Sequence, residues 1–222
     1  MKEKSLKARA IYGLFPANSV GDDIEVYNED KSKTLVKFLT LRQQLKKKKG
    51  NPNFALSDFI APKSSNIEDY IGCFCVTTGF GSDELSKKYE DKIDDYNSIM
   101  VKALADRLAE AYAEYLHQLI RKEKWGYSQN EKLDNNELIK ESYQGIRPAP
   151  GYPACPDHSE KLKIWNLLEV EKSIGAKLTD SFAMMPASTI SGYYFAHPEA
   201  KYFSINQINI EQIKELAEKK KI

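Results

Sequence analysis

Residues 69–81 read DYIGCFCVTTGFG, a mostly apolar run that is closed by glycines. An apolar run of this length, bounded by turn residues, predicts a buried strand. Cys73 and Cys75 lie two positions apart, so on a strand both side chains point to the same face. A metal pair would require histidine or cysteine partners at matched spacing, and none are near in the sequence. We therefore predict a core strand whose cysteines pack as small apolar residues.

A long helix is predicted after this strand, over about residues 94–124. Asp94 and Asp95 place negative charge at its N-terminus, where the helix dipole favours it. Apolar residues recur at three- and four-residue steps, as on the face that an amphipathic helix turns toward its core: Leu104, Leu108, Ala111, Tyr115 and Leu119.

The chain before residue 69 is predicted to form strands and a loop. Residues 8–44 contain two short strand-like runs around a turn, with turn residues at 21–23 and 28–30. Four consecutive lysines at 46–49 follow and end in Gly-Asn-Pro. Such a charge run is typical of a solvated surface loop.

Two helices are predicted between residues 130 and 180. The first is short, over residues 137–143. The second begins after Asp157, which with Glu160 three residues on has the spacing of a capping box. It stops at Gly175, a residue that suits the left-handed end of a helix.

The last part of the chain returns to strands. Residues 181–208 predict a strand, a break, a second strand, a hairpin turn at 197–200 and a third strand. Asn209 then begins a terminal helix. Because strands and helices mix without strict alternation, the sequence predicts an α+β fold rather than a doubly wound sheet.

The composition narrows the class of protein. A chain of 222 residues can bury a core of its own. The net charge of +1 argues against nucleic acid as the main partner, and no apolar run is long enough for a membrane span. The N-terminus has basic residues but no apolar segment of a secretory signal. Three cysteines are too few for a disulfide framework, so we expect a cytoplasmic protein.

Two motifs are too weak to carry an assignment. Gly79 and Gly81 begin a dinucleotide-binding pattern, but Glu84 stands where its third glycine should be. Cys155, Asp157 and His158 are all zinc-ligating types, yet their spacing matches no zinc pattern. Cys155 is no better as a nucleophile, because side chains three apart around a proline rarely align for proton transfer. No catalytic residue and no metal ligand is assigned.

The long helix also carries a polar stripe, formed by Asp106, Glu110, Ala113 and His117 at steps of four, three and four. It lies opposite the apolar face described above. One interpretation of the stripe is a polar helix face exposed to solvent. An acidic stripe beside a small residue is equally suited to a cationic ligand or to a histidine of a partner.

The most unusual stretch is residues 145–161, GIRPAPGYPACPDHSEK, which holds four of the nine prolines. Prolines fix φ and lack N–H donors, so the segment keeps its shape and leaves carbonyls free. Arg147 can bind a carboxylate through two hydrogen bonds, and Gly151 permits close approach of the backbone to a ligand. Tyr152 offers an aromatic face. The set suits a small molecule with a carboxylate, a planar ring and exocyclic donors, although a rigid loop with Arg147 in an internal ion pair is an alternative.

Residues 13–27, 100–117, 145–161 and 181–203 closely resemble the C-terminal activation domain of cobalamin-dependent methionine synthase, in the order of that family. The resemblance implies one domain over residues 1–222, with a central antiparallel sheet flanked by helices. It implies binding of S-adenosylmethionine (AdoMet), which remethylates cobalamin after oxidation to inactive cob(II)alamin. The implied partners are the cobalamin-binding domain and an electron donor, flavodoxin or a related reductase.

The resemblance also implies roles for particular residues. Arg147 matches the arginine that holds the methionyl carboxylate of AdoMet, and the backbone near Ala149 would meet the adenine. Asp106 matches a position that contacts the displaced histidine of the cobalamin domain, and His158 matches a histidine beside the ligand loop. Other matched positions lie near the ligand: Gly151, Tyr152, Tyr202, Glu110 and Glu141.

The sequence departs from the family in three respects. The family's domain begins upstream with a helical segment that contributes an aspartate to the AdoMet site, and these residues have no equivalent of it. Met185 and Ala187 replace an expected tryptophan and glycine. No homocysteine, folate or cobalamin-binding part is recognisable, so the chain alone is not expected to make methionine.

Two rival interpretations remain open. One is a monomeric docking module that contacts the cobalamin domain and the electron donor but binds no AdoMet by itself. The other is a free-standing metal-dependent enzyme that uses Cys155, Asp157 and His158.

Overall fold

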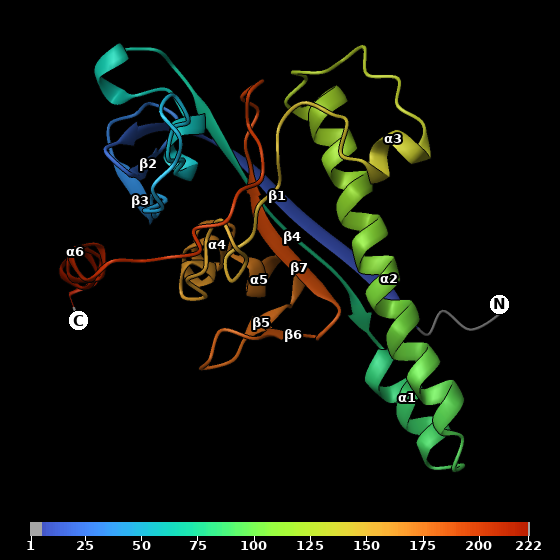
Figure 1. Ribbon diagram of the computed structural model, residues 1–222. Helices are drawn as coiled ribbons and strands as arrows, with labels where there is room; N and C mark the ends of the chain where they lie inside the picture. Colours follow the sequence, from blue (N-terminus) through green and yellow to red (C-terminus); the bar gives the residue numbers. More distant parts are fainter. Residues whose placement is uncertain (1–5, 222) are drawn as a thin grey trace. The chain divides into compact units, whose positions relative to one another are not determined.

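The computed structural model describes residues 6–221 and confirms the predicted α+β fold (Figure 1). Five strands form an antiparallel sheet in the order β3-β2-β1-β4-β7. Their bounds are β1 Lys7–Val20, β2 Asp23–Tyr27, β3 Thr34–Leu39, β4 Tyr70–Phe80 and β7 Thr189–Tyr194. A second, two-stranded sheet pairs β5, Lys177–Leu178, with β6, Met184–Met185.

Helices occupy much of the remaining described chain. The α-helices are α1 Ser82–Glu90, α2 Asp95–Leu119, α3 Asn135–Ile139, α4 Glu160–Leu167, α5 Val170–Ile174 and α6 Ile210–Lys220. A π-helical turn over Ile120–Lys124 continues α2, as the predicted limits of the long helix required. No helix in residues 6–221 combines the length and the apolar character that a membrane crossing needs.

The residues cluster into two compact units, each made of three separate stretches. The first contains residues 1–13, 73–130 and 164–192, and the second contains residues 14–72, 131–163 and 193–222. Strands β1, β4 and β7 contribute residues to both units. The prediction of a single domain over the whole chain stays a prediction.

The N-terminal part of the sheet contains one strand more than predicted. The second half of β1 pairs with β2 around a tight turn, with Val20 opposite Asp23, and β2 pairs in turn with β3. The ladder between β2 and β3 shifts register at Val26, which marks a bulge. Pro16 and Asn18 lie inside β1, and such turn-type residues hide its 14-residue length from sequence patterns.

The first unit is built around β4 and α2. Cys73, Phe74 and Cys75 are fully buried, which confirms the predicted core strand, and burial raises the pKa of both thiols. The Thr78 hydroxyl donates a hydrogen bond of 2.6 Å to the carbonyl oxygen of Ala105 on α2. The strand and the helix therefore approach closely.

The predicted buried face of α2 is wrong. Leu104, Leu108 and Tyr115 are exposed, and the helix instead buries Ala105, Ala109 and Ala113 together with Val101, Leu116 and Ile120. Alanines four residues apart form a flat face that lets a helix lie close to its neighbour. The face that α2 buries is therefore the one whose small side chains pack closely, not the one with the largest apolar residues.

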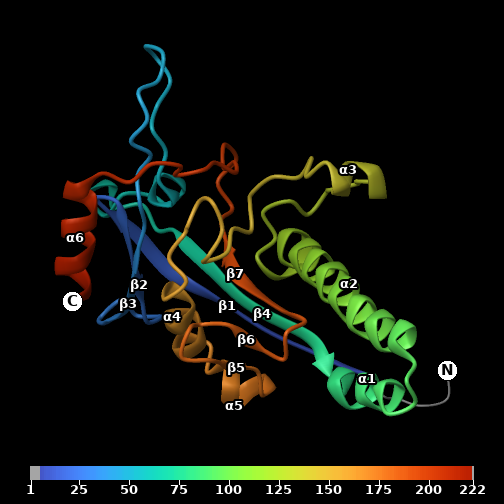
Figure 2. The same ribbon diagram turned by 60° about the horizontal axis from the view of Figure 1, so that its bottom comes forward.

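Helix α1 was not predicted, and it packs against α2 near the start of that helix (Figure 2). The Glu90 carboxylate at its end accepts hydrogen bonds from Ser86 and Ser98 and pairs with Lys102 at 3.1 Å. These contacts join α1 to the first turns of α2.

The predicted helix ends are mostly confirmed. Asp94 and Asn209 cap α2 and α6 by accepting hydrogen bonds from the backbone N–H groups of Asn97 and Gln212. Gly175, with φ of 80°, ends α5 as predicted. The short helix begins and ends earlier than expected, at Asn135–Ile139 rather than 137–143.

Two details of the second predicted helix are wrong. The helix is interrupted at Glu169, whose φ of 48° separates α4 from α5. The capping box of Asp157 with Glu160 does not form, because the Glu160 carboxylate is buried and accepts a hydrogen bond of 3.1 Å from the backbone N–H of Leu39. A residue 121 positions away uses the group that local spacing assigned to the cap.

The C-terminal strands agree only in part with the prediction. Strands β6 and β7 stand where the first two strands were predicted, and the turn closes with a hydrogen bond from Ala200 N–H to the His197 carbonyl. No third strand follows this turn in the part of the chain that the structure describes.

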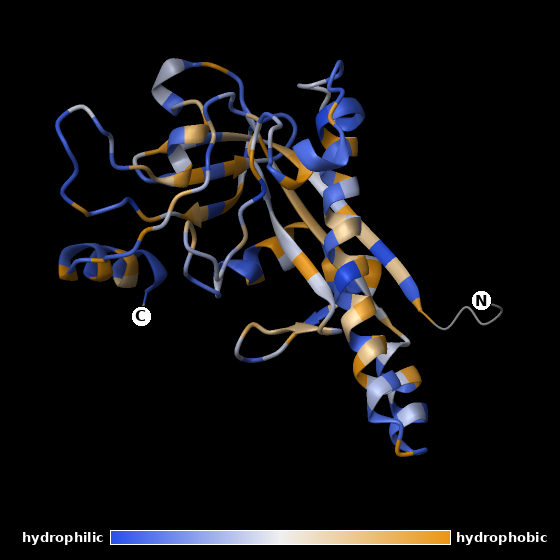
Figure 3. Ribbon diagram, turned by 45° about the vertical axis from the view of Figure 1, so that its right-hand side comes forward, coloured by the Kyte–Doolittle hydropathy of each residue, from blue (hydrophilic) through white to orange (hydrophobic). Residues whose placement is uncertain are grey.

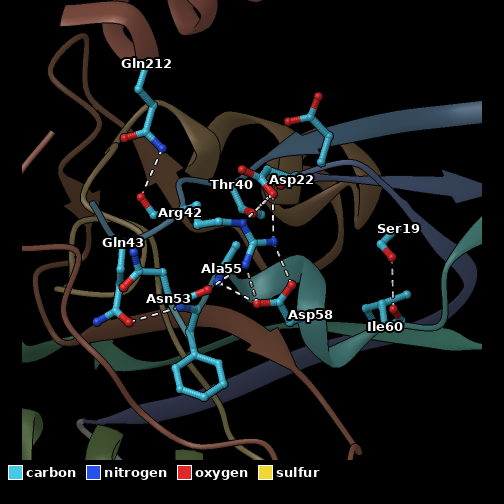
Figure 4. Close-up of polar contacts among 12 residues, drawn as sticks. Ser19, Asp22, Thr40, Arg42, Gln43, Asn53, Ala55, Asp58, Ile60 and Gln212 are labelled. Atoms are coloured by element: carbon cyan, nitrogen blue, oxygen red, sulfur yellow. Dashed lines mark hydrogen bonds and ion pairs between the residues drawn. The ribbon is translucent and has the colours of Figure 1, made fainter. Parts of the chain in front are cut away.

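Arg42 holds the loop after β3 in the second unit (Figure 4). Its guanidinium makes a two-pronged contact with Asp58, at 2.7 Å on each side, and also binds Asp22 and the carbonyl of Asn53. Burial favours the protonated form of Asp58, but the bonds from Arg42 hold the pKa of Asp58 below its ordinary value. The lysines at 46–49 follow this anchor, and all but Lys47 are exposed, as predicted for a surface loop.

Glu25 on β2 gives a test of charge stabilisation. Its carboxylate contacts Lys63 at 2.9 Å and Lys37 at 3.1 Å, and these ammonium groups lower the pKa of Glu25 to about 2. A lowered folded-state pKa stabilises the protein above the unfolded value near 4.5, and this contribution is lost as pH falls toward 2. We expect Glu25→Gln to lower the free energy of unfolding by about 1–2 kcal/mol at pH 7.

Urea unfolding from pH 7 to pH 3 measures this effect. The difference between Glu25→Gln and the parent should shrink as the pH falls below 4.5. Glu29→Gln is the matched control, because Glu29 is exposed in the next turn, and it should leave stability unchanged. A difference that stays constant over this pH range would contradict the charge explanation.

Candidate functional site

The proline-rich segment, residues 145–161, belongs to the second unit and is held by the stretch that follows β7. Ile146 and Phe195 exchange two backbone hydrogen bonds of 3.0 Å. Tyr193 N–H donates to the Pro148 carbonyl and Ile205 N–H donates to the Pro153 carbonyl, both at 2.9 Å. The segment thus behaves as an irregular strand whose missing donors are supplied by residues 193–205.

A tight turn lies within this segment. Gly151 N–H donates to the Cys155 carbonyl at 2.7 Å, Cys155 N–H to the Tyr152 carbonyl at 2.9 Å and Tyr152 N–H to the Ala149 carbonyl at 3.2 Å. The sequence prediction of free carbonyls is therefore wrong for much of the segment, where these carbonyls accept backbone hydrogen bonds: Ile146, Pro148, Ala149, Tyr152, Pro153, Cys155, Asp157, His158 and Ser159. Their hydrogen bonds make the turn rigid.

Only glycine fits position 151 without strain, because of its backbone conformation and its close neighbour. Its φ of 94° lies in the region that L side chains rarely adopt, and a Cβ atom would lie 2.3 Å from the His158 ring. The close approach that we predicted at Gly151 is made by the His158 ring, which lies beside the loop.

Arg147 and Tyr202 meet although 55 residues separate them. The backbone N–H of Arg147 donates a hydrogen bond of 3.1 Å to the Tyr202 hydroxyl. Arg147 is half-buried, whereas the side chains of Tyr202 and Tyr152 are 42% and 64% exposed. The backbone of Arg147 and the hydroxyl of Tyr202 therefore lie side by side in the second unit.

Lys161 is a functional candidate that the sequence prediction missed. It is only 6% exposed, and its ammonium lies 2.8 Å from His158 Nδ1, so it donates a hydrogen bond to the unprotonated nitrogen of that ring. Burial lowers the pKa of Lys161. The spacing of three residues at the start of a helix could have suggested this pair.

The interpretation as a metal-dependent enzyme gains no support from the geometry. Within residues 6–221 no three His, Cys, Asp or Glu side chains gather as a metal site would require. The Asp157 carboxylate accepts hydrogen bonds from Ser159 and pairs with Lys220, and burial raises the pKa of the Cys155 thiol to about 12. A thiol with so high a pKa is a poor nucleophile.

Comparison with known proteins identifies the family of this chain. The family described as vitamin B12 dependent methionine synthase, activation domain, matches residues 1–221. The chain belongs to this family. The structure of the MetH reactivation domain bound to AdoHcy is similar to it, with 56% sequence identity and a TM-score of 0.96. The match covers 99% of this chain and 67% of that chain.

Three further residues that the resemblance assigned to this activation domain lie outside the proline-rich segment. Glu141 is exposed just after α3, with φ of 54°. Asp106 and Glu110 belong to the first unit, where both are exposed on α2. The Ser188 hydroxyl donates a hydrogen bond of 2.5 Å to the Asp106 carboxylate.

The polar stripe on α2 is only partly a solvated surface. Ala113 and His117 are fully buried: Ala113 belongs to the buried alanine face of α2, and His117 lies beside the chain that follows the π-helical turn. There the Tyr127 hydroxyl lies 3.4 Å from His117 Nε2. The stripe therefore ends at Glu110, and His117 belongs to the core of the unit.

Replacing Gly151 tests the rigidity of the turn. We expect Gly151→Ala to destabilise the activation domain by about 3 kcal/mol, from the unfavourable backbone angle together with the clash with His158. Gly50→Ala is a close control, because Gly50 has φ of 95° but nothing within 4 Å of an added Cβ. It should cost about 1 kcal/mol.

Urea unfolding of both variants separates the two contributions. Adding His158→Ala to Gly151→Ala should recover the steric part of the loss and leave the backbone part. Equal losses for Gly151→Ala and Gly50→Ala would show that the contact with His158 imposes no constraint on the turn.

Proposed function

We propose that this activation domain binds AdoMet and supports the reductive methylation of inactive cob(II)alamin held by a cobalamin-binding domain. The observation that carries the proposal is its 56% identity, over 99% of its length, to a reactivation domain bound to AdoHcy. AdoHcy is AdoMet without the transferred methyl group, so a site that holds one holds most atoms of the other. The proline-rich segment, with Arg147 beside Tyr202, supplies the groups that such a ligand needs.

Each part of AdoMet has a counterpart in the second unit. The Arg147 guanidinium would grip the methionyl carboxylate through charged hydrogen bonds. The backbone near Ala149 and Gly151 would meet the adenine, and Tyr152 and Tyr202 would provide aromatic surface. The rigid turn keeps these groups in place, so little conformational entropy is lost on binding.

Acidic residues complement the cationic parts of the ligand. Glu141, which belongs to the second unit, would attract the ammonium or sulfonium group of AdoMet. Asp106 would receive the displaced histidine of the cobalamin domain, and its bond from Ser188 fixes the carboxylate for that contact. His158 would steady the ligand turn through its packing at Gly151.

The domain acts by presentation. One electron from the donor protein would first reduce cob(II)alamin to nucleophilic cob(I)alamin on the partner domain. AdoMet would then supply the methyl group and leave as AdoHcy. Holding both reactants in one complex raises their effective concentration by orders of magnitude. The domain thus has a role within a methyltransferase, but alone it makes no methionine. We further propose that it is a cytoplasmic monomer that receives electrons from flavodoxin or a related reductase.

One observation favours a second candidate function. The related reactivation domain bound to AdoHcy has about a third of its chain outside the 67% that matches. If that part is essential for the ligand, these 222 residues form a docking module for the cobalamin domain and the electron donor.

Calorimetric titration with AdoMet distinguishes the two functions. We expect saturable binding, weakened about 10- to 100-fold by Arg147→Ala, because a charged hydrogen bond contributes about 1.5–3 kcal/mol. Arg107→Ala, which removes an exposed arginine from α2, should bind AdoMet like the parent. No binding by the parent chain would favour the docking module.

Asp106→Asn tests the contact with the partner domain. We expect it to slow reductive methylation of a purified cobalamin-binding domain about tenfold, because the neutral amide attracts the partner's histidine less. Its affinity for AdoMet should stay within twofold of the parent, measured by calorimetry. A fall in AdoMet affinity equal to the loss of rate would place Asp106 in the ligand site instead.

A further inference from the structure

Lys161 places a buried positive charge beside the turn of the proline-rich segment. Its side chain is only 6% exposed, although lysine is among the residues that proteins bury least. Taking an ammonium group out of water costs free energy, and this cost lowers the pKa of Lys161. An apolar side chain of similar length would avoid the cost, so burial alone does not account for a lysine at this position.

The ammonium of Lys161 binds one particular ring nitrogen of His158. Its Nζ atom lies 2.8 Å from Nδ1 of that ring, and the Lys161 N–H donates a hydrogen bond of 3.1 Å to the His158 carbonyl. A charged ammonium group has only donors, so Nδ1 accepts the bond and carries no proton. The ring proton of neutral His158 is therefore on Nε2.

The same ring fills the space that a side chain at position 151 would occupy. A Cβ atom on Gly151 would lie 2.3 Å from Cε1, 2.6 Å from Nδ1 and 2.9 Å from Nε2 of His158. The ring therefore lies directly against the backbone of the turn, whose Gly151 N–H donates to the Cys155 carbonyl. A chain of contacts thus runs from Lys161 through His158 to Gly151, and all three residues belong to the second unit.

His158 depends on this lysine for its orientation. Within residues 6–221, the Lys161 ammonium is the only group that hydrogen-bonds to the His158 ring, and the residue is otherwise exposed. An exposed imidazole without such a bond rotates between rotamers and exchanges its proton between the two ring nitrogens. The turn would then lose the neighbour that lies against Gly151.

We propose that Lys161 is a positioning residue of the AdoMet site, which acts through His158 on the backbone of the turn at Gly151. Its ammonium holds the ring in the Nε2–H form and in contact with the turn, so the backbone near Ala149 and Gly151 keeps the shape that receives the ligand. A site that is already ordered binds more tightly, because less conformational entropy is lost on binding. The proposal rests on the proposed function and adds a residue that controls the affinity of the same site.

Nitrogen NMR of the histidine rings in the 222-residue chain measures the tautomer of His158. The chain has three histidines, and the signal that His158→Phe removes belongs to His158. Above neutral pH, we expect a protonated Nε2 and an unprotonated Nδ1 in the parent, and a mixture of both neutral forms in Lys161→Met. Lys161→Arg should restore the single form, because a guanidinium group also has only donors.

Calorimetric titration with AdoMet measures the effect on the ligand. We expect Lys161→Met to weaken binding about tenfold without lowering the unfolding midpoint, because the substitution removes a buried charge. Lys214→Met, which removes an exposed lysine from α6 in the same unit, should bind AdoMet like the parent. In a chain that already carries His158→Phe, Lys161→Met should have no further effect on affinity, because the lysine acts through the histidine.

Each arm of the experiment can overturn the proposal. An Nδ1–H form in the parent would do so, because a neutral lysine would then accept the bond. Unchanged AdoMet affinity in Lys161→Met, or a full loss that persists with His158→Phe, would exclude action through His158. A midpoint that falls together with the affinity would assign Lys161 to the stability of the fold. Failure of the proposed function is distinguishable, because the parent chain itself would then bind no AdoMet.

Discussion

The candidate site depends on how the carbonyls of the proline-rich segment are satisfied. Four prolines remove N–H donors from residues 145–161, so this segment cannot complete a ladder by itself. The N–H groups of Tyr193, Phe195 and Ile205 donate hydrogen bonds to carbonyls of the segment instead. The Tyr202 hydroxyl accepts a hydrogen bond from the Arg147 N–H. The position of Arg147 is therefore set by a stretch about 50 residues away, and a ligand meets a turn that is already formed.

Local signals in the sequence were sufficient wherever the physical cause is local. Asp94 was predicted at a helix start for its negative charge, Asn209 as the residue that begins the last helix, and Gly175 at a helix end because it adopts positive φ. The core strand could be predicted because a continuous apolar run requires burial on both faces of the sheet. Arg147, Gly151 and Tyr152 could be proposed from the residues alone, whereas the other candidate site residues were named only through the family resemblance.

Predictions failed where a distant residue decides the outcome. Glu160 was assigned to a cap, but the backbone of Leu39 uses its carboxylate. The carbonyls of Ile146, Pro148 and Pro153 were expected to be free, but they accept hydrogen bonds from donors about 50 residues further along the chain. Lys161 was overlooked because a buried lysine is exceptional, although its spacing from His158 is compatible with the contact that the structure shows. Sequence patterns report what a residue can do, while packing selects which partner it finds.

The orientation of α2 also depends on packing that the sequence pattern does not show. A pattern rule places its largest apolar residues inside, but the helix buries its alanines, because a flat face of small residues fits against β4 at hydrogen-bond distance from Thr78. The larger apolar residues Leu104, Leu108 and Tyr115 are then left on the surface, and orange bands recur along this helix in Figure 3. Asp106 and Glu110 lie on a third side of the helix, between these two apolar faces. One helix thus buries a face of small residues, exposes its larger apolar residues and carries an acidic edge, so no single amphipathic pattern describes it.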